Sequence, residues 1–150
     1  MLTEGKSAPD FSLEDDTGKA VSLSSFRGKT VVVYFYPKDD TPGCTKEACG
    51  FRDANDLFLA KGAVVIGISP DKPASHGKFR AKYGLPFVLL ADPEHAVLEA
   101  WGAWGEKAMY GKKYMGVVRS TVVIAPDGMV KKVFPKVSPE GHAQEILALL

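Results

Sequence analysis

Two apolar runs constrain the fold of this chain more than any other feature of its sequence. Residues 30–36 read TVVVYFY, and residues 63–69 read AVVIGIS. β-branched and aromatic residues favour strands, and a strand without polar alternation is buried on both faces. A helical pattern lies between the two runs, so we expect neighbouring parallel strands joined by a right-handed crossover.

The remaining patterns predict an α/β fold with a mixed central sheet and flanking helices. Residues 1–28 form a lead-in with a turn at residues 15–18 and a short strand near residues 21–23. Residues 101–118 give the weakest signal, which favours an ordered loop or a short edge strand. The other expected elements are helices at residues 73–83, 94–100 and 140–150, a strand at 87–91, and a hairpin of 119–124 with 130–134.

The length and composition are those of one globular domain, residues 1–150. Nineteen basic and eighteen acidic residues give a net charge of +1, which does not indicate a nucleic-acid or anionic-membrane partner. The first six residues lack the apolar core of a signal peptide, and no apolar run approaches membrane-spanning length. We therefore expect a cytoplasmic protein, in which a cysteine pair is more often catalytic or metal-binding than a structural disulfide.

The only two cysteines, Cys44 and Cys49, follow the first apolar run. Thr41 and Pro42 are typical of a helix start, and Gly62 ends the helical pattern that follows. Cys44 would then lie in the first turn of a helix, where the backbone amides and the helix dipole favour an anion. The sequence thus predicts a reactive thiolate at Cys44, and the alternative is a small buried cysteine of the core.

Cys49 follows five residues later on the same predicted helix. Residues five apart on a helix have Cα atoms roughly 8–9 Å apart, which is beyond the reach of a disulfide. A bond between the two cysteines would therefore require local unwinding of the helix. The alternative for Cys49 is a core cysteine.

Metal binding is the weaker use of this pair. The C-x-x-x-x-C spacing is not that of a zinc site, and the three histidines are scattered along the sequence. His76, His95 and His142 are each expected at the surface. There is also no glycine-rich phosphate loop.

The motif Pro37-x-x-x-Thr41-x-x-Cys44, with Glu47 three residues later, resembles the active-site signature of the peroxiredoxins. The second cysteine, Cys49, is similar to that of the bacterioferritin comigratory protein (peroxiredoxin Q) subgroup, the atypical two-cysteine type. Further similarity lies in the segments Ala8-Pro9-Asp10-Phe11 and Arg119-Ser120-Thr121, so that the resemblance covers essentially the whole chain.

This resemblance implies a thioredoxin-like fold with an N-terminal extension and a thiol-dependent peroxidase. Cys44 would be the peroxidatic nucleophile and Cys49 the resolving cysteine. Arg119 would contact the Cys44 thiolate, while Thr41 would hydrogen-bond the thiolate or the peroxide. Two further roles are implied: Pro37 shields the thiolate from water, and Glu47 is a first-turn helix acid or an orienter of the arginine.

The same resemblance implies a hydroperoxide substrate, an intramolecular disulfide and recycling by thioredoxin or a similar dithiol, in a monomer without cofactor or metal. Two other functions remain open from the residues. One is a general disulfide oxidoreductase, although C-x-x-C is absent. The other is a non-enzymatic redox sensor or binding module that uses the same helix switch.

Overall fold

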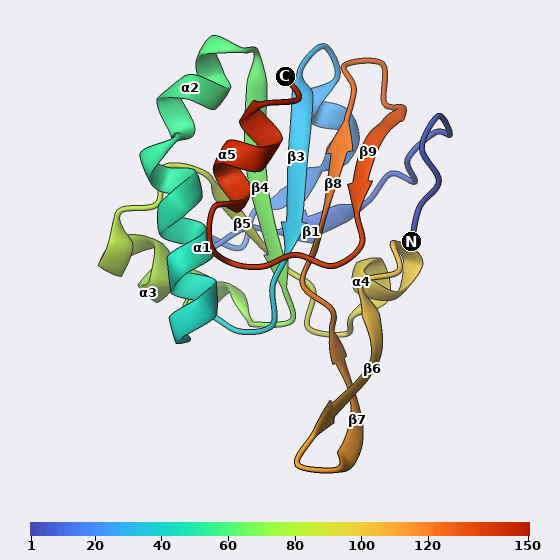
Figure 1. The fold of residues 1–150 in the computed structure, drawn as a ribbon. Helices are drawn as coiled ribbons and strands as arrows, with labels where there is room; N and C mark the ends of the chain where they lie inside the picture. The colour runs from blue at the N-terminus through green and yellow to red at the C-terminus, as the bar shows by residue number, and fades with distance from the viewer.

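A computed structural model describes residues 1–150 and places a seven-stranded mixed sheet at the centre (Figure 1). Across the sheet the strands are β2 (Ala20–Ser22), β1 (Ser12–Glu14), β5 (Val88–Ala91), β4 (Ala63–Ser69), β3 (Thr30–Phe35), β8 (Ser120–Ile124) and β9 (Val130–Phe134). β6 (Trp104–Met109) and β7 (Lys112–Val117) form a separate two-stranded sheet. The helices are η1 (Leu23–Phe26), α1 (Pro42–Asp53), α2 (Asn55–Ala60), α3 (Pro73–Tyr83), α4 (Ala96–Ala100) and α5 (His142–Leu147).

The parallel pairing of β3 with β4 is confirmed. Val32 lies opposite Val65, and the register continues through Phe35 and Ile68. The other side of β3 pairs with β8 in the antiparallel direction, so β3 is a central strand and is almost entirely buried. The mixed sheet and the expected hairpin of β8 and β9 are therefore both present.

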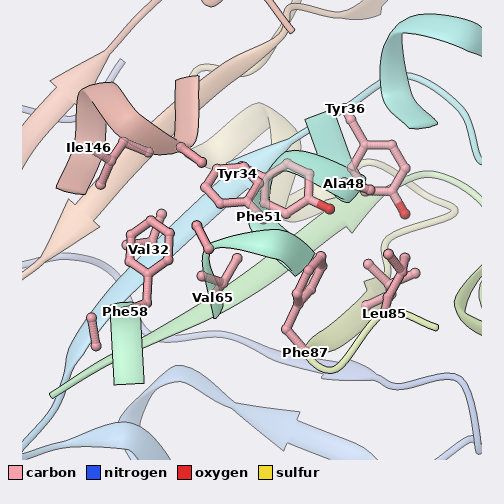
Figure 2. Packing of buried hydrophobic residues seen from close by; sticks show 14 of the residues in the cluster. Val32, Tyr34, Tyr36, Ala48, Phe51, Phe58, Val65, Leu85, Phe87 and Ile146 are labelled. Carbon is pink, nitrogen blue, oxygen red and sulfur yellow. The ribbon is translucent and has the colours of Figure 1, made fainter. Parts of the chain in front are cut away.

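A core lies on each face of the sheet. The face that α1, α2 and α5 cover holds a cluster of stacked aromatic rings (Figures 1 and 2). Phe51 of α1 stacks on Tyr34 with 4.6 Å between ring centroids, and it also contacts Phe58 and Phe87. The opposite face is filled from other segments, including Leu98 of α4. No helix here has the length and apolar character needed to cross a membrane.

The helix expected after the first strand is divided in two. α1 ends at Asp53, and Ala54 has φ −96° and ψ 1°, which is not helical, before α2 begins. Ala54 and Phe58 nevertheless stay buried, as the helical spacing predicts. A break of one residue leaves the apolar periodicity intact, so this pattern cannot reveal it.

Within residues 101–118 the structure has a hairpin of two strands, β6 and β7, so the expectation of a loop or a short edge strand is wrong. β6 and β7 pair along their full length and project away from the main sheet (Figure 1). Tyr110 and Gly111 at the tip both have positive φ, as in the two-residue turns that suit hairpins. Met109, Tyr110 and Met115 are exposed. Because only the base of this hairpin, at Trp104 and Val117, packs against a core, the sequence lacks the alternation that marks a strand.

β1 was not expected. It pairs with both β2 and β5 in the antiparallel direction and so joins the N-terminal lead-in to the main sheet. The strand has only three residues, one of which is half-buried. Such a short segment carries too few residues to show a period of two.

Gly67 provides a test of the packing beneath the aromatic cluster. A Cβ at this position would lie 2.9 Å from both Tyr34 and Leu89 atoms. Gly67→Ala should lower the free energy of unfolding by about 1–3 kcal/mol, measured by urea denaturation, because the rings cannot move without disturbing the core.

Gly77→Ala is the matched control for that measurement. Its Cβ would meet only the Asp16 carbonyl oxygen at 3.9 Å, within α3. Alanine is the better helix former, so this change should raise stability by about 0.5–1 kcal/mol. Equal stability of Gly67→Ala and the wild type would contradict the packing that the structure shows.

Candidate active site

The candidate site begins where β3 ends. Residues 37–41 leave the carboxyl end of this strand, and Pro42 then occupies the first turn of α1. Thr41 is the N-cap residue by its backbone angles, but its hydroxyl donates to the Lys38 carbonyl oxygen at 2.9 Å. The side-chain cap expected of Thr41 is therefore not made. Pro37 is half-buried in the same loop.

Cys44 lies in the first turn of α1, as predicted, and its residue is 1% exposed. Arg119 precedes β8, whose Ser120 pairs with Phe35 at the end of β3. This pairing brings the guanidinium beside the cysteine, and Arg119 Nη2 donates to Cys44 Sγ at 3.2 Å. The contact that the resemblance implied between these two residues is present.

Glu47 holds the other side of the same guanidinium. Arg119 Nη1 donates to Glu47 Oε1 at 2.7 Å, and the Glu47 side chain is fully buried. Of the two interpretations of Glu47, the geometry fits the orienter of the arginine, because the ion pair fixes the direction of the fork. The second oxygen, Oε2, has no hydrogen-bond partner.

Burial and charge act in opposite directions on this pair. Burial raises the pKa of the Glu47 carboxyl to about 7, although the positive charge of Arg119 works against the rise. Partial burial opposes the charge on Arg119, but Glu47 and Cys44 outweigh it, and the pKa of Arg119 is raised. A permanently charged guanidinium that donates to sulfur favours the thiolate.

Gly43 makes this approach of the arginine possible. A Cβ on Gly43 would lie 3.3 Å from Arg119 Nη2 and 3.4 Å from Pro139 Cγ. The first of these contacts is tighter than ordinary packing. The sequence P-G-C at the helix start therefore includes a steric requirement that helix propensity does not explain.

Cys49 lies on the same continuous helix, and both cysteines are free thiols. It is half-buried and lines a polar groove of about 470 Å³ between α1 and residues 139–144. Cys44 is not among the residues that line this groove. The two thiols thus face different surroundings, as their spacing on a helix predicts.

A second hollow, of about 410 Å³, reaches the site from the side of the β6–β7 hairpin. Arg119 lines it together with Lys107 and Lys136. The Arg119 side chain is 16% exposed, whereas the Cys44 residue is 1% exposed. Arg119 is therefore more accessible from the solvent than the cysteine to which it donates.

The expectation of surface histidines is wrong for two of the three. His76 is fully buried, His142 is 3% exposed, and His95 is half-buried against the Trp104 ring. Burial lowers the pKa of His142, while Glu145 opposes the change. Isolated histidines in a sequence carry no signal of burial.

Asp39, Asp71 and His76 are the residues that could hold a metal ion, with ligand atoms within 4.8 Å of one another. His76 Nδ1 and Asp39 Oδ2 are already in direct contact at 2.7 Å. Asp71 Oδ2 accepts from the Asp39 backbone N–H and from Ser69. This arrangement fits a network of hydrogen bonds better than a set of ligands directed at a common centre.

Comparison with known proteins gives consistent results. The sequence profile of the AhpC/TSA family matches residues 5–133. Peroxiredoxin Bcp from Bacillus subtilis is 49% identical over 146 residues, which are 97% of this chain and 93% of that protein. Peroxiredoxin Bcp from Escherichia coli is 45% identical over 97% of this chain and 94% of its own.

Solved structures agree with these relatives. A mutant of PrxQ from Xylella fastidiosa superimposes with a TM-score of 0.94 and 31% identity, over 99% of this chain and 95% of that one. The bacterioferritin comigratory protein of Xanthomonas campestris is described for its alkyl peroxide reduction activity. It superimposes with a TM-score of 0.88 and 39% identity, over 93% of this chain and 88% of that one. The thioredoxin-like fold expected from the sequence is thereby confirmed.

The burial of Glu47 predicts a measurable pH dependence of stability. Its pKa is about 7 in the folded protein and 4.5 in the unfolded chain, so the folded state binds more protons between these values. The free energy of unfolding should fall as pH rises through this window. Glu47→Gln should remove up to about 3 kcal/mol of that fall, measured by urea denaturation at a series of pH values.

His142 has the opposite dependence, but it is present in both proteins and cancels in the difference. Glu94→Gln, an exposed acid far from Arg119 in sequence, is the control and should give a curve parallel to the wild type. A Glu47→Gln curve parallel to the wild type would show that the buried carboxyl does not titrate in this window.

Proposed function

This chain belongs to the AhpC/TSA family and within it to the Bcp/peroxiredoxin Q group, so it is a peroxidase of the peroxiredoxin type, and we propose that it reduces hydrogen peroxide and organic hydroperoxides through Cys44. The observation that carries the proposal is the contact of Arg119 Nη2 with Cys44 Sγ at a helix start. A guanidinium and a helix N-terminus together favour a thiolate, which is the nucleophilic form of cysteine.

In the first step the Cys44 thiolate attacks the terminal oxygen of the hydroperoxide. The S–O bond forms as the O–O bond breaks, and the departing oxygen takes a proton to leave as water or an alcohol. The sulfur is oxidised to a sulfenic acid and the peroxide is reduced. Arg119 lies where it can donate to the peroxide oxygens as charge develops on them, because it contacts both the sulfur and the solvent-facing hollow.

In the second step the Cys49 thiol attacks the sulfenic acid sulfur, which forms an intramolecular disulfide and releases water. A dithiol such as thioredoxin then reduces this disulfide to the two thiols and is itself oxidised. The groove beside Cys49 offers access for that exchange. Pairing within one chain requires no second copy, so we propose a monomer that works in the cytoplasm.

The geometry supports the proposed roles of Glu47, Pro37 and Thr41 to different degrees. Glu47 orients Arg119 through the ion pair, and Pro37 and Thr41 contribute through the loop that leads into α1. The Thr41 hydroxyl donates to the Lys38 carbonyl oxygen in this state. To bond the thiolate or an incoming peroxide, it would have to exchange that partner.

Single substitutions should separate the two cysteines by role. Cys44→Ser should abolish peroxide consumption, because no other thiol lies beside Arg119. Cys49→Ser should consume one equivalent and stop as a sulfenic acid. Mass spectrometry after one equivalent of peroxide, followed by turnover with a thioredoxin system, measures both.

Loss of the first step in Cys49→Ser, with its survival in Cys44→Ser, would reverse the assignment. Oxidation of the wild type by one equivalent without turnover, even with a dithiol present, would identify a redox sensor. Thiol exchange with disulfide substrates in the absence of peroxide consumption would instead identify a general disulfide oxidoreductase.

The disulfide should form only with partial unwinding of α1. Both cysteines lie within this one helix, and a gap of roughly 8–9 Å between Cα atoms cannot be closed by rotamers. Amide hydrogen exchange in residues 41–52 should therefore become faster after oxidation, while β3 keeps its protection. Phe51 would leave its stack on Tyr34, so the oxidised form should also be less stable.

The comparison is made between the reduced protein and the protein with a confirmed disulfide. Cys49→Ser treated with peroxide serves as the control for oxidation without a bond. Equal protection of residues 41–52 in the reduced and disulfide forms would rule out the unwinding.

A further inference from the structure

The loop that carries Pro37 and Thr41 is tied to the body of the protein by a buried polar network. Asp39 lies within this loop and is 8% exposed. Its Oδ1 accepts from the Tyr36 hydroxyl at 2.6 Å, and its Oδ2 accepts from the Ser75 hydroxyl at 2.7 Å. Its backbone N–H donates to Asp71 Oδ2 at 2.8 Å. One loop residue thus bonds to Tyr36 just after β3, to the segment after β4 and to α3.

His76 is the innermost member of this network and is fully buried. Its Nε2 lies 3.0 Å from the Leu90 carbonyl oxygen in β5, and its Nδ1 lies 2.7 Å from Asp39 Oδ2. A carbonyl oxygen only accepts, so Nε2 carries a hydrogen. The other bond therefore holds a proton between Nδ1 and the carboxylate, and the ring spans from the loop to the sheet.

A second anchor lies immediately after the first. Asp40 has φ +57°, a conformation that residues other than glycine rarely adopt. Its carboxylate accepts from Lys82 Nζ at 2.7 Å and from the Tyr83 hydroxyl at 2.8 Å, both at the end of α3. These bonds hold the loop at the last residue before Thr41.

We propose that Asp39 and His76 are a positioning pair, which fixes residues 37–41 and through them the first turn of α1, so that Cys44 faces Arg119. This proposal rests on the proposed function, and it adds the position in the chain at which the unwinding of α1 stops. Asp39 bonds to Tyr36 just after β3, to α3 and to the segment after β4, none of which belongs to the unwinding helix. The anchor therefore stays closed when α1 opens, and the hinge lies between Asp40 and Pro42.

Two substitutions of one residue separate the two bonds of His76. The amide nitrogen of asparagine takes the place of Nδ1, so His76→Asn keeps a donor for Asp39 and loses the bond to Leu90. The amide nitrogen of glutamine takes the place of Nε2, so His76→Gln keeps the bond to Leu90 and loses the bond to Asp39. Leu98→Ala is the control for a general loss of stability, because Leu98 packs on the opposite face of the sheet.

The first measurement is the rate constant for Cys44 oxidation by hydrogen peroxide, in single turnover and on the Cys49→Ser background. His76→Gln should slow this step by at least about tenfold, while His76→Asn and Leu98→Ala should stay within about threefold of the parent. Equal rates for His76→Asn and His76→Gln, or an equal loss in Leu98→Ala, would overturn the positioning role.

The second measurement needs no peroxidase activity. Hydrogen exchange of the Asp39 amide, followed by NMR, reports directly on the bond to Asp71. His76→Gln should speed this exchange at least about tenfold over His76→Asn. If the wild type consumes no peroxide, the proposed function fails. The comparison of the two variants still shows whether the bond between His76 and Asp39 holds the loop in place.

The same amide tests the hinge in the wild type, without any substitution at His76. On formation of the disulfide, the Asp39 amide should keep its protection while the amides of residues 44–49 lose theirs. Loss of protection at Asp39 together with α1 would show that the anchor opens and would overturn the proposal.

Discussion

The antiparallel pairing of β8 with β3 is the constraint on which the candidate site depends. Arg119 and Cys44 are 75 residues apart in sequence, and no local pattern connects them. The register of Ser120 with Phe35 places Arg119 at the end of β3 where α1 begins. A shift of the register by one residue would turn the arginine to the other face of the sheet. The pairing of these two strands therefore determines whether Arg119 can reach Cys44 at all.

Local patterns in the sequence predicted the elements that are long or strongly apolar. The runs at residues 30–36 and 63–69 identify β3 and β4 because burial on both faces excludes polar residues. Pro42 and the apolar spacing after it identify α1. The same reasoning could not find the hairpin of β6 and β7, which is exposed along most of its length, or the break at Ala54, which leaves the periodicity unchanged.

The candidate site was predictable only in part for a related reason. Cys44 and its helix start follow from local sequence, whereas Arg119 was singled out through the family resemblance. The buried network of Asp39 and His76 escaped both routes, because neither residue has a sequence signal for burial. The sequence also could not show that position 43 favours a residue without a side chain, because Arg119 and Pro139 approach Gly43 from distant segments. A local pattern in the sequence contains no information about contacts with distant segments.

The burial of Cys44 separates its reactivity from its accessibility. Its residue is 1% exposed, whereas Arg119, which donates to its sulfur, lines the solvent-facing hollow. Because so little of the residue is exposed, a bulky electrophile reaches this sulfur only after α1 or Arg119 has moved. The frequency of such openings therefore sets an upper limit on the rate at which larger reagents can modify the thiol.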